Sequence, residues 1–542
     1  MTRVWTIDID GMTCEQCALA IDAQLHRTGG VLASRTTFDP TRARVEAASD
    51  VEAVILVDAI ARAGYRARAA REDASPDAAV DDVLIIGSGG AAMGAALAAA
   101  AAGAVVTMVE RGTLGGTCVN VGCIPSKALM RAADTLHRAQ STPFAGIRVG
   151  GQLDDYSALT AQRDDLVAHL RDEKYASVLA RQPLIRLVEG EARLTGPDHV
   201  AINGRERRFR RCVVATGSHA VLPPIPGLID VDPLTSTEAL ALKELPRRLA
   251  VIGGRYIALE LAQAFARLGA RTTIIQRNSR ILPDQDVDVT DALTGYLRAE
   301  GIDVVTGSVV TAARRTAHDI ELDLDGPSGR RTVTVDRVLA ATGRRASTVG
   351  LGLDVAHVKT DADGQIIVDE QLRTSNPRVF AAGDVIGAPA FVYTAAYEGR
   401  LSAMNALGAS TSRDYTALPW VIFTDPQLAV VGLTEAEAQR RGIAVDVARV
   451  DLDQVPRALV ARDTRGFVKL VKERGGDRLL GATIVAPEGG DLIMEPTLAI
   501  RFGITVAQLA GTFHPYLTQT EAVKLAAQAF TTDVKQLSCC AS

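Results

Sequence analysis

Six of the seven cysteines fall in three close pairs, and such pairs can bind a soft metal ion or exchange electrons. The pairs are Cys14/Cys17, Cys118/Cys123 and Cys539/Cys540. A thiolate is a soft metal ligand, and two neighbouring thiols can also close and reopen a disulfide. Seven cysteines among 542 residues are too few for the disulfide framework of a secreted protein. The pairs therefore indicate chemistry in a reducing compartment.

The central pair lies in a glycine-rich segment, residues 115–127, that ends in Pro-Ser-Lys. We predict that this segment leads into a helix, because a helix N-terminus and a nearby cation lower the pKa of a thiol. On spacing alone, Cys118 and Cys123 are equally compatible with buried structural cysteines or a metal clip. The glycines and the Pro-Ser-Lys ending favour a redox-active pair.

A first dinucleotide site is predicted just before this segment. Gly87-x-Gly89-x-x-Ala92 follows an apolar strand and opens a helix, and Glu110 ends the next strand. The glycines let a pyrophosphate approach the helix N-terminus, and the carboxylate can accept hydrogen bonds from ribose hydroxyls. The uncharged run 83–109 is long enough to cross a bilayer. Its internal turn and its Gly103 break instead predict a buried strand, turn, helix and strand.

A second glycine turn, Gly253-Gly254, again lies between an apolar strand and a helix. The strand after that helix ends in Gln276-Arg277, where an acid would hold the ribose of NADH. We therefore expect NADPH, with Arg277 attracting the 2′-phosphate; the alternative is that Arg277 is a solvated surface charge. Each unit is followed by an apolar strand with a small-residue turn, at 211–217 and 337–343. This repeat predicts two related nucleotide-binding folds, the first interrupted by the second.

Residues 115–127 and the two glycine units together resemble the flavoprotein disulfide reductases, the family of glutathione reductase and dihydrolipoamide dehydrogenase. The resemblance implies an α/β chain with tandem Rossmann-like FAD and NAD(P) domains, an α+β dimerisation domain and a homodimer. It also implies that Cys118 is the interchange thiol and that Cys123 contacts the flavin. The remaining expected roles are Lys127 near the flavin, Tyr256 as a gate for the nicotinamide and Tyr516 in the metal pocket.

The resemblance also supplies the expected cofactor contacts. For FAD they are Gly87, Gly89, Gly90, Ala92, Glu110, Gly116, Thr117, Lys127, Thr216, Gly217 and Asp384. For NADPH they are Gly253, Gly254, Glu260, Gln276, Arg277 and Gly343.

The first 70 residues resemble the heavy-metal-associated domain. The resemblance rests on Gly-Met-Thr-Cys-x-x-Cys at 11–17 and on Gly64-Tyr65, and it implies a ferredoxin-like βαββαβ fold. Two thiolates without a third ligand suit linear Cu(I) or Hg(II) better than tetrahedral Zn(II), with a redox Cys-x-x-Cys as the alternative. The predicted domains are a metal-binding domain at 1–70, a linker at 71–79, an FAD-binding domain at 80–230 continued at 349–415, an NADPH-binding domain at 231–348 and a dimerisation domain at 416–542.

The C-terminal region separates the possible substrates. Relatives that reduce organic disulfides pair a histidine with a glutamate five positions later, but here Gln519 follows His514. Glutamine cannot supply a carboxylate, so His514 is expected to be structural. The tail cysteines Cys539 and Cys540 can be two soft metal ligands on a flexible arm, or they can lie in a disordered terminus without a function.

Together these features predict NADPH-dependent reduction of Hg(II) to elemental mercury through FAD. Hg(II) would pass by thiol exchange from Cys14/Cys17 through Cys539/Cys540 to Cys118/Cys123. Three alternatives stay open: a dihydrolipoamide or disulfide reductase with a fused metal domain, a metal-trafficking protein, and reduction of an organic coenzyme disulfide. For Hg(II) reduction the expected partners are Hg(II) itself, small thiols and a second copy of the chain, with transient handover from a membrane mercury transporter.

The bulk composition excludes other classes. Hydrophobic residues make up 47% of the chain and charged ones 23%, as in ordinary globular proteins. The net charge of −5 and pI of about 6.0 argue against nucleic acid as a partner. The N-terminus alternates polar and apolar residues and lacks the apolar core of a signal peptide. We therefore expect a cytoplasmic protein without stable membrane insertion.

Overall fold

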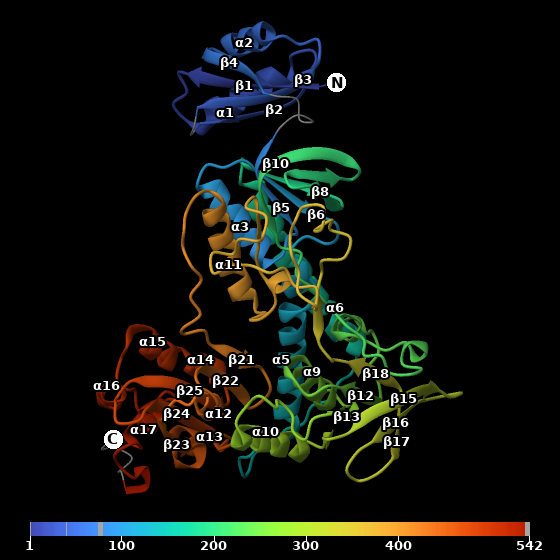
Figure 1. Ribbon diagram of the computed structural model, residues 1–542, viewed down its shortest axis with the longest axis vertical. Coiled ribbons are helices and arrows are strands. Elements are labelled where there is room, and N and C mark those ends of the chain that lie inside the picture. Colours follow the sequence, from blue (N-terminus) through green and yellow to red (C-terminus); the bar gives the residue numbers. More distant parts are fainter. Residues whose placement is uncertain (1, 39–40, 74–79, 537–542) are drawn as a thin grey trace. The chain divides into compact units, whose positions relative to one another are not determined.

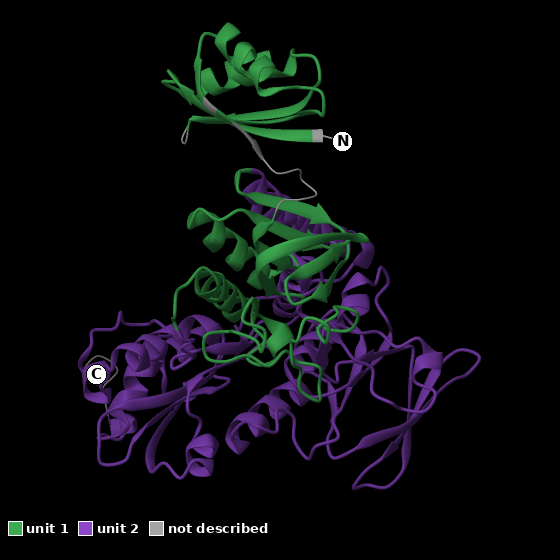
Figure 2. Ribbon diagram, turned by 45° about the horizontal axis from the view of Figure 1, so that its top comes forward, with its two compact units in different colours: residues 1–112, 181–216, 348–411 green, residues 113–180, 217–347, 412–542 purple. Residues whose placement is uncertain are grey.

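The structure is a computed structural model that describes residues 2–38, 41–73 and 80–536 (Figure 1). The chain divides into two compact units (Figure 2). Unit 1 comprises residues 1–112, 181–216 and 348–411, and unit 2 comprises residues 113–180, 217–347 and 412–542. The sequence predicts an FAD-binding domain over 80–230, whereas residues 113–180 belong to unit 2. The reason is that their helix α5 (Cys123–Gln140) shares a hydrophobic core with helix α9 (Tyr256–Arg267).

The N-terminal part of unit 1 has the element order β-α-β-β-α-β. Its elements are β1 (Thr2–Asp10), α1 (Glu15–His26), β2 (Val31–Thr37), β3 (Arg42–Ala48), α2 (Ala53–Arg62) and β4 (Arg66–Asp73). The strands form an antiparallel sheet in the order β2-β3-β1-β4. Alternate residues of β1, such as Ile7 and Ile9, are buried against Ile21 and Leu25 of α1. Strand β4 extends to Asp73, three residues into the predicted linker.

The rest of unit 1 is built on a mainly parallel sheet in the order β7-β6-β5-β10-β9-β8, with β20 beside β10. Its elements are β5 (Asp81–Ile86), α3 (Gly90–Ala101), β6 (Val106–Glu110), β7 (Ile185–Glu189), β8 (Ala192–Gly196), β9 (His199–Ile202), β10 (Arg205–Val214), β20 (Val379–Ala381), η3 (Asp384–Ile386) and α11 (Val392–Ala406). Helices α3 and α11 pack closely, since a Cβ on Gly399 would lie 1.9 Å from the Ala91 carbonyl oxygen. The predicted strand, turn, helix and strand over 83–109 is confirmed.

Residues 218–346 of unit 2 contain a second parallel sheet, with the order β14-β13-β12-β18. An antiparallel sheet β15-β16-β17 and the pair β11-β19 adjoin it. The elements of residues 218–346 are β11 (Ser218–Ala220), η2 (Ile229–Val231), α8 (Ser236–Ala241), β12 (Arg248–Ile252), α9, β13 (Arg271–Ile275), α10 (Val287–Ala299), β14 (Asp303–Val305), β15 (Val309–Arg315), β16 (Ile320–Asp325), β17 (Arg331–Val335), β18 (Arg337–Ala340) and β19 (Arg344–Ala346). The redox segment and its supports are α4 (Gly116–Val121), α5, α6 (Tyr156–Arg171), η1 (Asp172–Ala176) and α7 (Ser177–Ala180).

The C-terminal part of unit 2 is an antiparallel sheet in the order β21-β22-β25-β24-β23, covered by helices. Its elements are β21 (Trp420–Ile422), β22 (Gln427–Gly432), α12 (Glu435–Arg440), β23 (Val445–Asp451), η4 (Leu452–Gln454), α13 (Pro456–Ala461), β24 (Phe467–Glu473), β25 (Leu479–Ala486), α14 (Gly489–Leu492), α15 (Met494–Phe502), α16 (Val506–Gly511), α17 (Glu521–Gln528) and η5 (Val534–Gln536). The predicted antiparallel strands at 421, 467 and 479 are confirmed.

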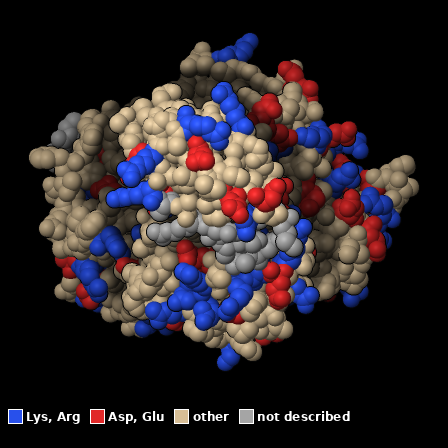
Figure 3. All heavy atoms as spheres, turned by 90° about the horizontal axis from the view of Figure 1, so that it is seen from above, with Lys and Arg blue, Asp and Glu red and all other residues tan. Residues whose placement is uncertain are grey.

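Charge is mixed on the face seen in Figure 3, where basic and acidic side chains alternate without a field of one sign. Within residues 2–38, 41–73 and 80–536, no helix combines the length and the apolar character that crossing a membrane requires.

Candidate active site

The two redox cysteines stand on either side of a glycine turn between two helices. Cys118 lies in α4 and Cys123 is the first residue of α5. Both helix starts require glycine: Gly115, before α4, has φ +102, and a Cβ there would lie 2.5 Å from Val119 Cγ1. At Gly122 a Cβ would lie 2.9 Å from the carbonyl oxygen of Thr117. This local packing sets Cys123 at a helix N-terminus, where the helix dipole stabilises a thiolate.

Hydrogen bonding makes the two thiols unequal. The Cys118 thiol donates to the Cys123 sulfur. This hydrogen bond and the charge of Lys127 together lower the pKa of Cys123 to about 7 despite its burial. The same bond, together with burial, raises the pKa of Cys118. Both side chains are free thiols in the structure, and the redox disulfide between them stays a prediction. Cys123 is therefore the sulfur of the pair that loses its proton first, and its thiolate gains population as pH rises through about 7.

Lys127 is held one turn into α5 by a carboxylate of α9. Its Nζ lies 2.6 Å from Glu260 Oε2 and 4.7 Å from the centre of the Phe423 ring. The other oxygen of Glu260 accepts a hydrogen bond of 2.9 Å from the backbone N–H of Phe423. Glu260, predicted as an NADPH contact, thus joins the redox helix to the segment before β22.

Tyr175 is a site residue that the sequence reasoning missed. It lies in η1, a π-helical turn, and a Cβ on Gly115 would be 3.5 Å from its ring carbon Cδ1. Burial raises the pKa of the Tyr175 phenol, and negative charge on Cys118 or Cys123 raises it further. Arg171, just before the turn, donates a hydrogen bond of 3.1 Å to Asn120 Oδ1 of α4. No local pattern marks a π-helical turn in advance, although such turns are frequent at functional sites.

Tyr256 and Tyr516, the two tyrosines that the sequence analysis assigned to the site, lie elsewhere in unit 2 than Tyr175. Tyr256 is the first residue of α9, and its ring stacks on Trp420 with centroids 5.3 Å apart. Tyr516 lies before α17 and is 51% exposed.

The first glycine unit fits a dinucleotide. Gly87 has φ +114, and a Cβ there would lie 2.4 Å from the carbonyl oxygen of Ala215. Helix α3 begins at Gly90 after Gly89, without a side-chain cap or an acid in its first turn, so its N–H groups suit a pyrophosphate. Glu110 accepts hydrogen bonds from Ser88 Oγ at 2.6 Å and from the Gly112 N–H at 2.7 Å. Its carboxylate oxygens keep lone pairs for ribose hydroxyls.

The second glycine turn has the same close approach of backbone to backbone, although Arg255 stands at its helix N-cap where the first turn has Gly89. A Cβ on Gly253 would lie 2.4 Å from the Ala341 carbonyl oxygen, as at Gly87. Gly254 packs against the buried side chain of Gln276, while Arg277 is exposed. An uncapped helix N-terminus with an exposed guanidinium and no acid at the strand end fits a phosphorylated ribose.

The remaining residues that were predicted to contact FAD or NADPH lie at turns or near helix starts. Asp384 begins η3 after Gly383, whose N–H donates to Glu398 Oε2 at 2.7 Å. The others are Ala92 in α3, Gly116 and Thr117 in α4, Thr216 and Gly217 after β10, and Gly343 after β18.

The N-terminal cysteines form a compact sulfur pair. Their Sγ atoms are 3.5 Å apart, and the Thr13 N–H donates to Cys17 Sγ at 3.5 Å. A hydrogen bond from the Tyr65 phenol and those from Thr13 lower the pKa of Cys17 to about 6. Cys17 is therefore a thiolate at neutral pH. Among the described residues, His, Cys, Asp and Glu side chains form no group of three or more able to hold a metal ion.

His514 has a carboxylate partner, contrary to the expectation from Gln519. Its Nε2 lies 2.7 Å from Glu495 Oε1, and its Nδ1 lies 3.0 Å from the Thr512 carbonyl oxygen. Glu495 belongs to α15 and lies 19 residues before His514 in the sequence, whereas relatives carry their glutamate five positions after the histidine. Cys539 and Cys540 lie outside the described residues.

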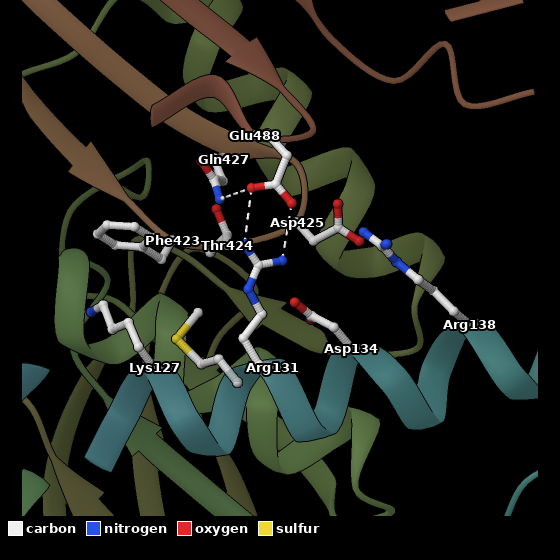
Figure 4. Close-up of a pocket in the computed structure, with 10 residues that line it drawn as sticks. Lys127, Arg131, Asp134, Arg138, Phe423, Thr424, Asp425, Gln427 and Glu488 are labelled. Carbon is white, nitrogen blue, oxygen red and sulfur yellow. Dashed lines mark hydrogen bonds and ion pairs between the residues drawn. The ribbon is translucent and has the colours of Figure 1, made fainter. Parts of the chain in front are cut away.

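A cavity of about 250 Å³ runs along α5 from Lys127 (Figure 4). In Figure 4 the Lys127 side chain extends toward Phe423, and Arg131 forms a two-pronged contact with Glu488 at 3.0 and 2.9 Å. The cavity is lined by Lys127, Met130, Arg131, Asp134, Arg138, Phe423, Thr424, Asp425, Gln427 and Glu488.

Comparisons with known proteins agree with this arrangement. Residues 81–399 match the pyridine nucleotide-disulphide oxidoreductase family, and residues 418–527 match its dimerisation domain. The mercuric reductase of Acidithiobacillus ferrooxidans is 45% identical over 98% of each chain, and that of Streptomyces lividans is 50% identical over 85% of this chain and 98% of its own. The HOCl-induced flavoprotein disulfide reductase RclA of Escherichia coli has a similar structure, with a TM-score of 0.74 and 28% identity over 82% of this chain and 99% of its own. The chain therefore belongs to the pyridine nucleotide-disulphide oxidoreductase family and, within it, to the mercuric reductases.

Proposed function

We propose that the chain reduces Hg(II) to elemental mercury with electrons from NADPH, and that Cys118 and Cys123 hold the metal during reduction. The observation that carries this assignment is the unequal thiol pair, with a Cys123 thiolate beside a Cys118 thiol. Hg(II) favours two sulfur ligands, and such a pair can displace the thiolates that bring it. When bound, FAD accepts a hydride from NADPH and makes two electrons available beside the thiols.

The chain's own residues perform the ligand exchange. The Cys123 thiolate attacks the incoming Hg(II) and expels one small thiolate. Cys118 then loses its proton to solvent, binds the metal and expels the second thiolate. Two electrons reduce the ion to Hg(0), and both sulfurs remain as thiolates, so the exchange itself forms no disulfide. Lys127 keeps a positive charge next to these anions, which is the reason it lowers the pKa of Cys123.

The same proposal assigns the cofactor cradles. Gly87, Gly89 and Glu110 would hold the pyrophosphate and ribose of FAD, with Asp384 at the ribityl chain. Gly253 and Arg277 would hold NADPH. Two observations support this assignment. A Cβ at Gly87 or at Gly253 would lie equally close, at 2.4 Å, to a carbonyl oxygen, and Arg277 is exposed just after β13.

The N-terminal part is proposed to be a ferredoxin-like heavy-metal-associated domain that collects Hg(II). Its element order, its sulfur pair and the lowered pKa of Cys17 support this role. From there Hg(II) would pass to the tail cysteines Cys539 and Cys540 and then inward. A homodimer in the cytoplasm, with small thiols or a membrane mercury transporter as donors, completes the proposal.

The test is release of mercury vapour from purified chain, NADPH and excess small thiol, with NADPH oxidation followed in parallel. Cys118→Ala and Cys123→Ala should each abolish both signals, and turnover retained by either variant would refute the inner site. Deletion of residues 1–79 should leave turnover with thiol-bound Hg(II) nearly unchanged. A core that loses turnover would show that the first domain is more than a collector.

A second candidate function is reduction of an organic disulfide, and the His514–Glu495 pair favours it. An imidazole held by a carboxylate can protonate the leaving thiolate that such a substrate releases. Assays with glutathione disulfide, lipoamide and Hg(II) side by side decide between the two. If this activity exists, Glu495→Gln should reduce disulfide turnover and spare mercury reduction, which needs no such proton.

A further inference from the structure

Helices α5 and α9 are joined by two ion pairs that match in spacing and are opposite in polarity. Lys127 Nζ of α5 lies 2.6 Å from Glu260 Oε2 of α9. Seven residues later on both helices, Asp134 Oδ1 of α5 lies 2.5 Å from Arg267 Nη1 of α9. The helices are thus parallel and in register, with the cation on α5 in the first pair and on α9 in the second.

The alternating polarity specifies one alignment of the helices. A slip of two turns would place either Lys127 beside Arg267 or Asp134 beside Glu260, each a contact of like charges. Such a contact is costly here because the Arg267 side chain is only 2% exposed and Glu260 is 9% exposed. The two ion pairs therefore favour the native register by attraction, and they disfavour a register shifted by two turns by repulsion.

The same face of α9 also holds the segment before β22. Gln263 accepts a hydrogen bond from the Asp425 N–H at 2.8 Å and donates one to the Asp425 carbonyl at 2.9 Å. Arg267 pairs with the Asp425 carboxylate at 2.9 Å and with Glu300 at 2.5 Å. Since the buried polar groups of α9 are satisfied by fixed partners, the second ion pair is anchored on the α9 side and can hold α5 in place.

Both helices begin at functional groups. Helix α5 starts at Cys123, and α9 starts at Tyr256, one residue after the Gly253-Gly254 turn. One residue of slip along a helix moves a group by about 1.5 Å, and a misplacement of this size can cost about two orders of magnitude in rate. The register of the two helices therefore sets how far Cys123 stands from the nucleotide turn.

We propose that Asp134 and Arg267 are positioning residues that set the height of the Cys123 sulfur relative to the Gly253-Gly254 turn. They act from about 16 Å along α5, eleven residues beyond Cys123. This role rests on the proposed function of Cys123, which it deepens by naming what holds the thiolate in place.

The test is Asp134→Asn in the full-length holoenzyme, because asparagine keeps the shape of the side chain and removes its charge. Three readouts apply: the thiolate-to-flavin charge-transfer absorbance of the dithiol form, the pH profile of residue-specific alkylation of Cys123, and kcat against KM for NADPH. We expect the absorbance to fall, the alkylation profile to shift and kcat to drop roughly tenfold, as for a displaced reacting group. Asp134→Glu, which restores the charge, should recover most of each loss.

Arg131→Gln is the matched control. Arg131 lies on the same helix between the two ion pairs, but it faces the exposed Glu488 instead of α9. This variant should leave all three readouts unchanged. If Asp134→Asn lowers only the thermal unfolding midpoint and keeps the absorbance and kcat of the parent, the pair is a structural clamp and the proposal is overturned.

Arg267→Lys decides the question if Asp134→Asn does not fold. It keeps the buried positive charge but loses the forked contacts, so the absorbance should fall as for Asp134→Asn, and a normal band would overturn the proposal. The absorbance and alkylation readouts need no mercury. A parent enzyme that showed both but released no mercury vapour would refute the proposed function without touching this inference.

Discussion

At Cys123 the protonation state of one sulfur decides whether the site can bind Hg(II). Its pKa of about 7 is the sum of opposing effects: the Cys118 hydrogen bond and the Lys127 charge lower it, and burial and Glu260 raise it. The thiolate is therefore favoured as pH rises through 7, so metal capture at the inner site should strengthen over this range.

Lys127→Gln should raise the pKa of Cys123, because the substitution removes a cation and leaves the Glu260 carboxylate unpaired beside the thiolate. A rise of about one unit lowers the thiolate fraction at pH 7 roughly fivefold. The rate of Cys123 alkylation by iodoacetamide in the dithiol enzyme, followed by mass spectrometry, should fall by that factor at pH 7 and recover at pH 9. An unchanged rate at pH 7 would mean that the lysine does not tune this sulfur.

Tyr65→Phe applies the same reasoning to the N-terminal pair. Removing the phenol removes the largest of the effects that bring the pKa of Cys17 to about 6, so its pKa should rise toward the ordinary value of a thiol. Alkylation of Cys17 at pH 6 should slow in the full-length protein, while alkylation of Cys123 stays as in the parent. Equal rates for parent and variant at pH 6 would contradict the assigned hydrogen bond.

The sequence predicted the sulfur pairs and the glycine turns because both are local patterns with one physical purpose. It could not predict Tyr175 or Glu495. Tyr175 reaches the redox turn only through the π-helical turn after α6, and Glu495 reaches His514 only because α15 approaches residues 512–517. These partners depend on tertiary packing, which leaves no mark at the residues themselves.

At the scale of elements, the two strand-turn-helix units were predictable since strand, glycine turn and helix are adjacent in the chain. The assignment of residues 113–180 to unit 2 depends on the packing of α5 against α9, which joins segments far apart in sequence.

The repeat of the glycine turns allows a paired test. A Cβ at Gly87 or Gly253 would meet a carbonyl oxygen at 2.4 Å, and both residues have positive φ, so alanine must displace the turn at either position. Gly87→Ala should yield protein with reduced flavin content. Gly253→Ala should keep the flavin spectrum and raise KM for NADPH about tenfold or more. The opposite pattern, with flavin lost from Gly253→Ala alone, would reverse the assignment of the two cradles.

At the scale of the whole molecule, the matched dimerisation domain implies a surface that a second copy covers. Helix α15 presents Met494, Leu498 and Phe502 on one face, at i, i+4 and i+8, and all three are exposed in the single chain. Phe502 is 74% exposed, and Phe513 in the following segment is fully exposed. Large apolar side chains gathered in this way mark a protein interface more often than a solvated surface.

Phe502→Asp should therefore weaken the dimer, because it places a charge in an apolar interface that cannot solvate it. Sedimentation at micromolar concentration should show a shift toward monomer, and Val349→Asp, at an apolar residue of unit 1 that is 88% exposed, should not. If the segment with Tyr516 completes the partner's active site, mercury reduction should fall more than NADPH oxidation by an artificial acceptor. A monomeric variant with full mercury turnover would show that each chain completes its own site.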